Sequence, residues 1–312
     1  MSFKNARSAL LAIVVLLAGV LPIMLVGQPA DAAYPGRDGR IAFVRNNQIF
    51  TMTSSGTDVR KLTHTGSNSQ PTWSPDGTRI AYLHQADGLT DVWVMGAWGR
   101  QKRNVTRSGD VTSAGASWSP DGTALAFASG TLKVISASAP FGSPTELTGV
   151  PTGGFCDDPT EPARPIFVDR FVAWSPDGTR IAVFDHADCY FDDRVDILDL
   201  ASQQLVQYSA SGADCCGYLR WTDLVWGPAN QFGYTQRDTG QYGEDVGAPT
   251  RIVYPGFASR DGDAEAAPSP SGTYLALTDT STPNGKVVRA RTDGTGRTVL
   301  VNGSQPDWQP VP

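Results

Sequence analysis

The chain contains 312 residues, with 31 acidic residues against 25 lysines and arginines and a formal net charge of −6. The basic residues are scattered along the sequence and form no stripe of the kind that follows nucleic-acid phosphates, which excludes a nucleic-acid partner. Thirty-three glycines, 22 prolines and little helical periodicity favour many short strands separated by turns. We therefore expect an all-β protein.

The N-terminal residues indicate export. Lys4 and Arg7 precede an apolar run from Ala9 to Val26, and Ala30-Asp31-Ala32 follows as an A-x-A cleavage signal. The sequence thus predicts a signal peptide over residues 1–32 and a secreted, cell-surface or periplasmic protein with one domain over residues 33–312. Because the apolar run is long enough to span a membrane, the alternative is an uncleaved anchor, which would be the only membrane contact.

A five-residue unit, Trp-Ser-Pro-Asp-Gly, recurs along the chain. Complete copies and weaker ones begin at Trp73, Trp118, Trp174, Trp226, Pro268 and Trp308. They stand 40 to 56 residues apart, a period typical of propeller blades built from several short strands. Proline fixes the first corner of a turn, aspartate bonds back to the backbone, and glycine adopts the positive φ that follows. Each unit therefore predicts a tight turn after the innermost strand of a blade.

An apolar, alternating strand follows each turn. Six such second strands are recognisable at residues 41–44, 80–83, 125–128, 181–184, 232–235 and 274–277. No Trp precedes the first strand and no strand follows Trp308, so we expect the C-terminal strand to pair with the N-terminal blade and close the ring. The prediction is a six-bladed β-propeller of four-stranded antiparallel blades. In the fifth blade a fourth strand is not recognisable between Tyr254 and Pro268.

The pattern Trp-Ser-Pro-Asp-Gly-Thr-Arg-Ile-Ala-Tyr at Trp73–Tyr82, with endings such as Leu62-Thr63, resembles the propeller repeat of TolB, the periplasmic component of the Tol-Pal envelope system. The resemblance covers the propeller domain only, from about Gly36 to Pro310. It implies the six-bladed fold and binding of a protein or envelope partner. Similar repeats occur in propellers that gate oligopeptidases and in some polysaccharide lyases, which keeps an enzymatic alternative open.

The unusual residues are predicted to share one face of the propeller. In a four-stranded blade, blade-to-blade loops and loops between the second and third strands lie on the same side, which we call the loop face. His64, the segment 150–170 and the Cys215-Cys216 pair fall in blade-to-blade loops. His84 and the segment 185–193 fall in second-to-third loops. Since long loops on a rigid scaffold commonly carry function, the loop face is the predicted functional face.

Four cysteines in an exported protein favour disulfides over metal thiolates. We expect disulfides to pin the long loop of the fourth blade, formed from Cys156, Cys189, Cys215 and Cys216. Pairing of the adjacent Cys215 and Cys216 with Cys156 or Cys189 is favoured over a strained vicinal ring. The sequence leaves the connectivity open, and a metal or redox site built from the four thiols is the alternative.

Acidic and aromatic residues gather in these loops and in the segment 236–248, another second-to-third connection. They are our candidates for partner binding: Asp157, Asp158, Asp185, His186, Asp188, Tyr190, Phe191, Tyr218 and Tyr242. Exposed aromatic rings anchor protein partners or stack on sugars, whereas beneath a pinned loop they would only pack. The aspartates, with Asp192 and Asp193, form either a solvated acidic rim or a set of hard oxygen ligands for Ca²⁺. We expect no cofactor, with Ca²⁺ as the alternative.

The chain contains no motif for a nucleophile or a metal enzyme such as G-x-S-x-G or H-E-x-x-H. The predicted function is therefore non-enzymatic: an exported, monomeric propeller that binds a protein or cell-envelope component through its loop face. The alternative is an extracellular carbohydrate-active lyase or hydrolase. In that case His64, His84 or His186 would act with the acidic loop and a divalent metal.

Overall fold

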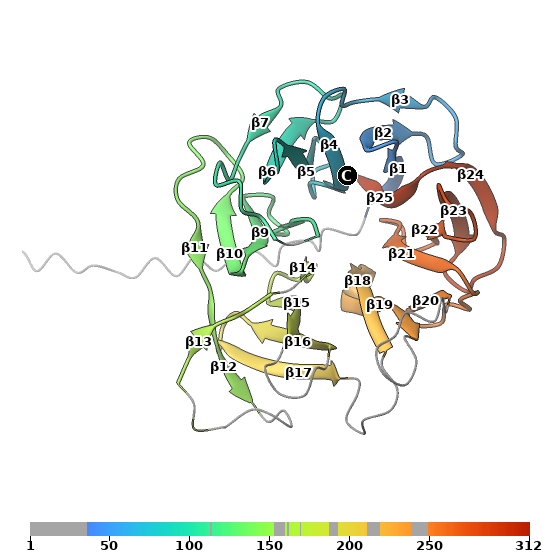
Figure 1. The fold of residues 1–312 in the computed structure, drawn as a ribbon. Helices are drawn as coiled ribbons and strands as arrows, with labels where there is room; N and C mark the ends of the chain where they lie inside the picture. The colour runs from blue at the N-terminus through green and yellow to red at the C-terminus, as the bar shows by residue number, and fades with distance from the viewer. Residues whose placement is uncertain are drawn as a thin grey trace, which may run out of the picture.

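Six β-sheets stand around a central axis and form a six-bladed propeller (Figure 1). The computed structural model describes residues 36–112, 114–152, 160, 162–168, 170–186, 193–210, 219–238 and 249–312. Within these ranges the only helical element is the 3₁₀ turn η1 (Pro228–Asn230). A helix long and apolar enough to cross a membrane is not found in the same ranges. The predicted all-β propeller fold is confirmed.

Each blade begins with an inner strand at the axis and ends with an outer strand at the rim. The first blade consists of β25 (Ser304–Val311), β1 (Arg37–Arg45), β2 (Gln48–Met52) and β3 (Arg60–Lys61). The second consists of β4 (Ser67–Trp73), β5 (Arg79–Ala86), β6 (Leu89–Gly96) and β7 (Arg103–Asn104). The third consists of β8 (Ser117–Trp118), β9 (Ala124–Ser129), β10 (Thr131–Ser136) and β11 (Thr145–Glu146). The sixth consists of β21 (Asp263–Pro268), β22 (Tyr274–Asp279), β23 (Lys286–Arg291) and β24 (Thr298–Asn302).

The fourth and fifth blades depart from this plan. The fourth has β14 (Val172–Trp174), β15 (Arg180–His186), β16 (Asp193–Asp199) and β17 (Gln204–Ala210), extended by β12 (Thr148–Thr152) and β13 (Arg164–Pro165). Because β12 pairs in parallel with the outer strand β17, part of the expected blade-to-blade loop covers an otherwise open sheet edge. The described part of the fifth blade has three strands, β18 (Leu219–Gly227), β19 (Gln231–Asp238) and β20 (Thr250–Val253).

The C-terminal strand closes the ring. β25 pairs antiparallel with β1, and Trp308 stands opposite Ile41 in this pairing. The side chains of both residues are almost completely buried. The closure predicted from the unmatched first strand and last Trp is therefore confirmed.

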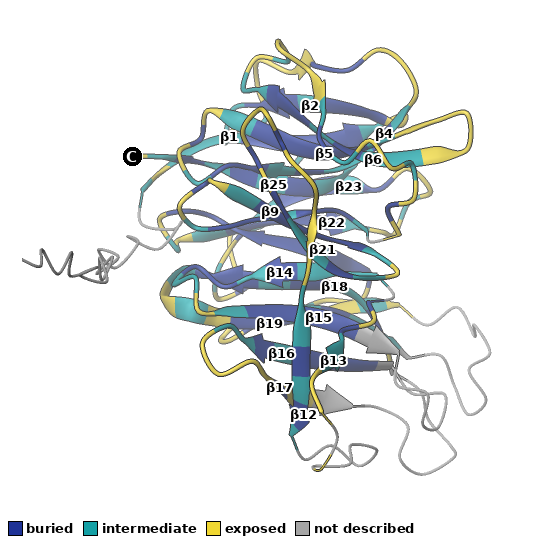
Figure 2. Ribbon diagram, turned by 90° about the vertical axis from the view of Figure 1, so that its left-hand side faces the viewer, coloured by how far each residue is buried: buried dark blue, intermediate teal, exposed yellow. Residues whose placement is uncertain are grey.

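The hydrophobic core is divided among the gaps between blades. Buried apolar residues form six clusters, and each cluster fills one of the six interfaces between neighbouring blades. Figure 2 shows the consequence, with buried strands stacked through the middle of the molecule and exposed residues at its faces and rim. Since each blade is apolar on both sides, it is stable only between two neighbours.

The Trp-Ser-Pro-Asp-Gly turns are hydrogen-bonded as the sequence predicts. In the second blade, Asp76 Oδ1 lies 2.5 Å from Ser74 Oγ and accepts the Thr78 N–H at 3.0 Å. Burial opposes ionisation of Asp76, but the hydrogen bonds from Ser74 and Thr78 outweigh it and hold the pKa below its usual value. The same bonds recur around Asp121 and Asp177. We call the side of the propeller that carries these turns the turn face.

The Trp of each complete unit packs in the cluster between its own blade and the preceding blade. The indole N–H of Trp118 donates to the carbonyl oxygen of Thr72 at 3.1 Å. In the fifth blade, the indole of Trp226 donates in the same way to Ala173 at 3.0 Å. The Arg79 guanidinium lies 4.6 Å from the centre of the Trp118 ring. Turn, Trp and Arg together therefore join neighbouring blades.

Substitution of Gly77 tests the fit between a turn and the closing strand. Gly77 has a φ of +66°, and a Cβ at this position would lie 2.0 Å from the carbonyl oxygen of Pro310 in β25. Because the methyl group must displace backbone, we expect Gly77→Ala to lower the free energy of unfolding by about 3 kcal/mol or more, measured by urea denaturation.

Gly130→Ala is the matched control. Gly130 has a similar φ of +72°, but a Cβ there would meet no atom within 4 Å. The control should lose only the cost of the left-handed backbone, about 1 kcal/mol. Equal losses in the two variants would show that Pro310 does not constrain the turn.

Candidate functional site

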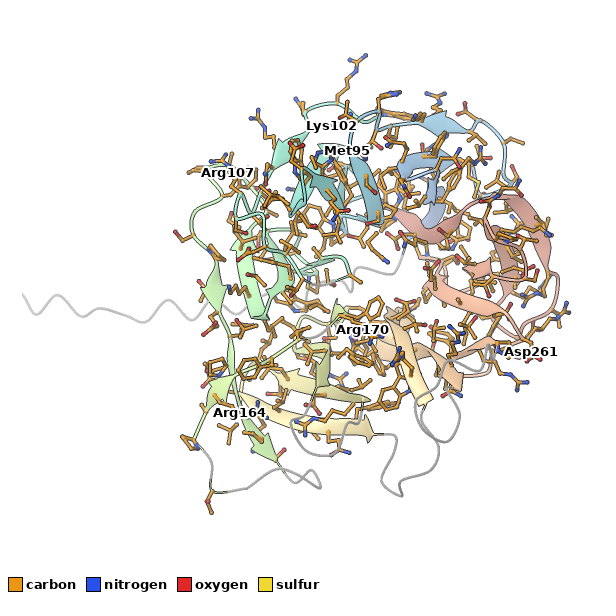
Figure 3. The ribbon with its side chains drawn as sticks, in the orientation of Figure 1. Met95, Lys102, Arg107, Arg164, Arg170 and Asp261 are labelled. Carbon is orange, nitrogen blue, oxygen red and sulfur yellow. The ribbon has the colours of Figure 1, made fainter. Side chains whose placement is uncertain are left out.

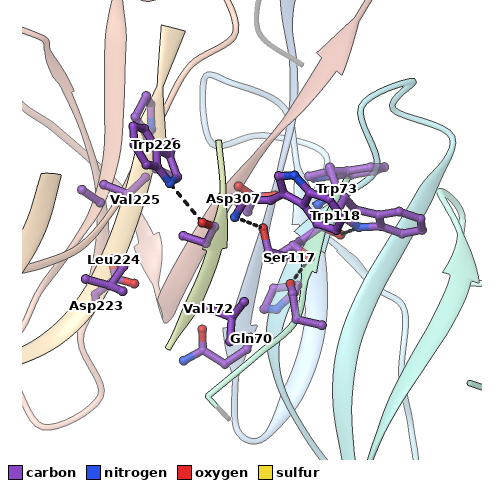
Figure 4. A pocket seen from close by; sticks show the side chains of 18 of the residues that line it. Gln70, Trp73, Ser117, Trp118, Val172, Asp223, Leu224, Val225, Trp226 and Asp307 are labelled. Carbon is purple, nitrogen blue, oxygen red and sulfur yellow. Dashed lines mark hydrogen bonds between the residues drawn. The ribbon is translucent and has the colours of Figure 1, made fainter. Parts of the chain in front are cut away.

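An axial channel of about 150 Å³ is lined by the inner strands of all six blades (Figure 4). The polar residues that line it are Gln70, Thr72, Ser117, Ser175, Asp223, Glu265, Gln305 and Asp307. Trp and Pro residues of the repeated turns supply much of the remaining wall. The channel therefore combines a ring-shaped apolar scaffold with a small set of carboxyl, amide and hydroxyl groups, which is the composition of a binding site.

Bulges in the inner strands bring three of these residues to the channel. Gln70, Glu265 and Gln305 have φ angles of 50°, 52° and 53°, and each lies at an irregularity in the pairing of its strand. A bulge residue in the left-handed region turns its side chain away from the regular alternation. Each of the three stands three residues before the Trp or Pro that precedes the turn. The bulge is therefore a repeated feature of the blades.

Side chains in the channel accept backbone hydrogen bonds across blade boundaries. Gln305 Oε1 accepts the N–H of Gln70, and Glu265 Oε2 accepts the N–H of Gln305, both at 2.8 Å. Asp307 Oδ2 accepts the N–H of Trp73 at 2.6 Å. These three bonds join the first blade to the second and the sixth blade to the first.

Comparable bonds join the remaining blades. Ser117 Oγ of the third blade accepts the N–H of Trp174 in the fourth at 2.9 Å. The Asp223 carboxylate of the fifth blade accepts the N–H of Ala266 in the sixth. The remaining two boundaries are joined by the Thr72 hydroxyl, which donates to Ala116 at 3.1 Å, and by the Trp226 indole described above. Every blade boundary thus has a hydrogen bond at or near the axis.

Burial raises the pKa of all three carboxyl groups in the channel. The pKa of Asp307 rises to about 7, although hydrogen bonds such as that from Trp73 favour its charged form. For Asp223, burial raises the pKa well above its ordinary value, and the nearby charge of Glu265 raises it further. Burial also raises the pKa of Glu265. A positive charge entering the channel would offset this penalty on the carboxylates.

The two ends of the channel differ in chemistry. Each inner strand runs from the loop face toward the turn face and ends at the repeated Trp or its equivalent. The indoles of Trp73 and Trp118 therefore lie at the turn-face end (Figure 4). Gln70 and Asp223, three residues earlier in their strands, lie closer to the loop face. Glu265 and Gln305 hold the same place in their strands and also lie nearer the loop-face end, whereas Asp307, one residue before Trp308, lies nearer the turn-face end (Figure 4).

Most of the predicted site residues lie outside the described residues. These are Asp157, Asp158, Asp188, Tyr190, Phe191, Tyr218 and Tyr242, with the four cysteines Cys156, Cys189, Cys215 and Cys216. Asp185 and His186 end β15, and their backbones pair with Arg194 and Asp193 of β16. The β15–β16 connection begins on the same side as the β5–β6 turn, the loop face. The disulfides and the gathering of these side chains stay predictions.

The two histidines whose side chains are described, His64 and His84, occupy separate environments on the loop face. His84 Nδ1 lies 2.9 Å from Asn68 Oδ1, and the His84 ring packs 4.8 Å from Trp93. Burial lowers the pKa of His84, and the Asp91 carboxylate partly opposes this shift. His64 is exposed in the connection between β3 and β4. Among the described residues, no group of three or more His, Cys, Asp or Glu is arranged to hold a metal ion.

The polar residues of the channel were not among the predicted site residues. One signal for them exists, because Ser-Gln-Pro-x-Trp occurs at both Ser69–Trp73 and Ser304–Trp308. The shared Gln-Pro step marks the same bulge in two adjacent blades. Asp223 and Glu265 have no comparable local pattern, and only the assembled ring brings them to the axis.

Sequence comparison finds short matches to TolB proteins, and no protein-family model matches the chain. The Tol-Pal system protein TolB 1 of Novosphingobium aromaticivorans is 32% identical over 71 residues, which is 22% of this chain and 16% of that protein. The TolB homolog of Protochlamydia amoebophila is 40% identical over 40 residues, or 13% of this chain and 8% of that protein. The matches thus span less than a fifth of either relative.

Solved structures extend the similarity over the whole ring. TolB from Acinetobacter baumannii superposes with a TM-score of 0.57 at 18% identity, over 89% of this chain and 68% of that chain. The fold is that of a TolB-like propeller. A putative TolB from Agrobacterium tumefaciens superposes with a TM-score of 0.53 at 16% identity, over 86% of this chain and 91% of that chain. A chain of the nidogen/laminin complex superposes with a TM-score of 0.55 at 10% identity, over 86% of this chain and 98% of that chain. Proteins with very different sequences therefore share this propeller fold.

The pKa of Asp307 predicts a pH-dependent stability. Its folded value of about 7 lies above the ordinary 3.8, so between roughly pH 4 and pH 7 the folded state holds a proton that the unfolded chain releases. The stability that this proton contributes is present at acidic pH and lost as the pH rises through about 7. Asp307→Asn keeps an oxygen that can accept the Trp73 N–H and does not titrate. At pH 8, we expect the free energy of unfolding of this variant to be about 1–3 kcal/mol higher than that of the unaltered protein.

Urea denaturation at pH 5 and pH 8 measures this difference. The increase in the free energy of unfolding caused by Asp307→Asn should be smaller at pH 5, because the Asp307 carboxyl of the unaltered protein is protonated there. Asp87 is exposed in the β5–β6 turn, and Asp87→Asn serves as the control, with the same pH dependence as the unaltered protein. A pH dependence that survives unchanged in Asp307→Asn would exclude Asp307 as its source.

Proposed function

We propose that this protein binds a protein or cell-envelope partner through its loop face, and that the channel mouth receives a basic side chain of that partner. The observation that carries the proposal is the trio Asp223, Glu265 and Asp307, whose charged forms are disfavoured by burial in the channel. A lysine or arginine of the partner would supply the missing positive charge and pair with the carboxylates.

The size of the channel favours a binding role. Its volume is about 150 Å³, whereas pockets for small-molecule ligands usually measure roughly 300–1,000 Å³. One long side chain or a narrow peptide segment fits such a channel, and an oligosaccharide does not. The larger part of the contact would therefore form on the surrounding loop face.

The loop face offers further groups to a partner. An open groove of about 690 Å³ lies between the first and sixth blades, beside Asn46, Asn47 and Asn284. On other blades, Leu89 at the start of β6 and Phe167 between β13 and β14 have 58% and 54% of their surface exposed. Exposed apolar side chains next to polar groups are typical of protein interfaces. The TolB-like fold, and the short match to a protein named for the Tol-Pal system, support a partner of this kind.

Cross-linked capture from the native envelope and medium tests the proposal. The unaltered protein is compared with a loop-face variant (Asp157→Ala, Asp158→Ala, His186→Ala and Tyr190→Ala) and with a channel variant (Asp223→Asn and Glu265→Gln). We expect one partner to be recovered with the unaltered protein and its yield to fall at least about fivefold in either variant, because the loop contacts and the charge pairing are removed.

Ser143→Ala with Thr145→Ala is the matched control, because both residues are exposed and lie near the opposite, turn face. This control should recover the partner in full. Equal recovery with all four proteins would contradict binding through the loop face. Turnover of an extracellular polysaccharide that is lost in the loop-face variant would instead support the enzymatic alternative.

The raised pKa values predict that partner affinity depends on pH. Protons compete with the partner's basic group for the channel carboxylates, so affinity should increase by about tenfold between pH 6 and pH 8. Titration of the purified partner by calorimetry measures this change. Binding by a variant that adds Asp307→Asn to the channel variant should not vary with pH. A pH response equal to that of the unaltered protein would show that these carboxyl groups do not cause it.

A further inference from the structure

A patch of basic and apolar side chains lies on the turn face, away from the channel mouth. It consists of Arg40, the segment 58–61 and the segment 96–103, at the edge of the first and second blades. Trp98 is 58% exposed and Val59 is 39% exposed. One acidic residue, Asp58, stands among six basic residues: Arg40, Arg60, Lys61, Arg100, Lys102 and Arg103.

Direct contacts make these segments one surface. The guanidinium groups of Arg40 and Arg60 lie 5.6 Å and 5.0 Å from the centre of the Trp98 ring. Asp58 forms ion pairs with both arginines at 2.9 Å. The N–H of Ala97 donates to the carbonyl oxygen of Thr78 at 2.8 Å, which fixes the Trp98 turn beside a repeated turn on the turn face. Lys102 lies at the outer edge of the second blade (Figure 3).

The charge of the chain is divided along its length. Residues 36–110 contain ten basic and six acidic residues, whereas residues 111–312 contain 13 basic and 24 acidic residues. The first two blades are thus positive in an otherwise acidic protein. A basic region on an acidic protein is a selective attractor for an anionic surface.

The start of the described chain lies next to this patch. Arg37 of β1 pairs with Val311 at the end of β25, and Arg40, three residues later, stacks on Trp98. The sequence that precedes Arg37 contains the apolar run from Ala9 to Val26. The chain therefore enters the propeller on the face that carries the exposed Trp and the basic residues.

We propose that this patch docks on a membrane surface rich in anionic phospholipid. Lysine and arginine near such a surface each strengthen binding by about fivefold, and Trp is favoured at the boundary between headgroups and acyl chains. Trp98 and Val59 would enter that boundary while Arg100 and Lys102 contact phosphates. This docking would turn the loop face away from the membrane. The proposal does not depend on the partner proposed for the loop face.

Quenching of tryptophan emission by brominated lipid tests the docking. The full chain is reconstituted in vesicles of brominated phosphatidylcholine, with and without about 30% phosphatidylglycerol, a level chosen to give a clearly negative surface. Residues 1–35 contain no Trp, so all of the tryptophan emission comes from residues 36–312. The contribution of Trp98 is the quenching measured for the unaltered protein minus the quenching measured for the Trp98→Phe variant. We expect it to be at least fivefold larger with phosphatidylglycerol than without.

Charge reversal supplies the matched comparison. The patch variant combines Lys61→Glu, Arg100→Glu and Lys102→Glu, and it should abolish the Trp98-dependent quenching. The comparison variant changes the net charge equally on other blades and should not abolish the quenching. It combines Arg251→Glu, Arg260→Glu and Arg291→Glu. Thermal unfolding of both variants confirms that they are folded. Quenching that is the same with and without phosphatidylglycerol, that is retained by the first variant, or that shows no contribution from Trp98 would overturn the proposal.

Discussion

The pairing of β25 with β1 is the contact on which the rest of this propeller depends. It converts an open row of six sheets into a ring and removes two exposed sheet edges. The same strand supplies Gln305 and Asp307, which accept hydrogen bonds from Gln70 and Trp73 of the next blade. Closure therefore builds the channel as well as the ring, because both the wall and its polar groups require the C-terminal strand in register.

The buried carboxyl groups of the channel oppose stability, and the proposed binding role would explain why they are kept. Asp223, Glu265 and Asp307 are held where their charged forms are disfavoured, although neutral side chains could accept the same hydrogen bonds. Proteins commonly retain such destabilising groups where they bind or react. A basic partner would relieve the penalty when it binds, so the free energy lost on folding at neutral pH is recovered in the complex.

The two faces of the ring suit different surroundings. The loop face combines an acidic channel mouth with exposed apolar side chains such as Leu89 and Phe167. The turn face carries short repeated turns and the basic patch around Trp98. With the patch on an anionic membrane, the channel mouth would face the aqueous space and remain open to a partner. Opposite electrostatic character on the two faces would thus orient the molecule without any change in the fold.

The sequence by itself determined those features that depend on neighbouring residues. Ser74, Asp76 and Gly77 form a turn through local bonds, and the repeat spacing specifies the blades and their closure. The parallel addition of β12 was decided only by tertiary structure, because it joins Val150 to Gln204, and no local pattern encodes such a pairing. The channel site has the same origin. Asp223 and Glu265 are ordinary polar residues within their own strands, and they become a buried, coupled pair only when the closed ring places six inner strands around one axis.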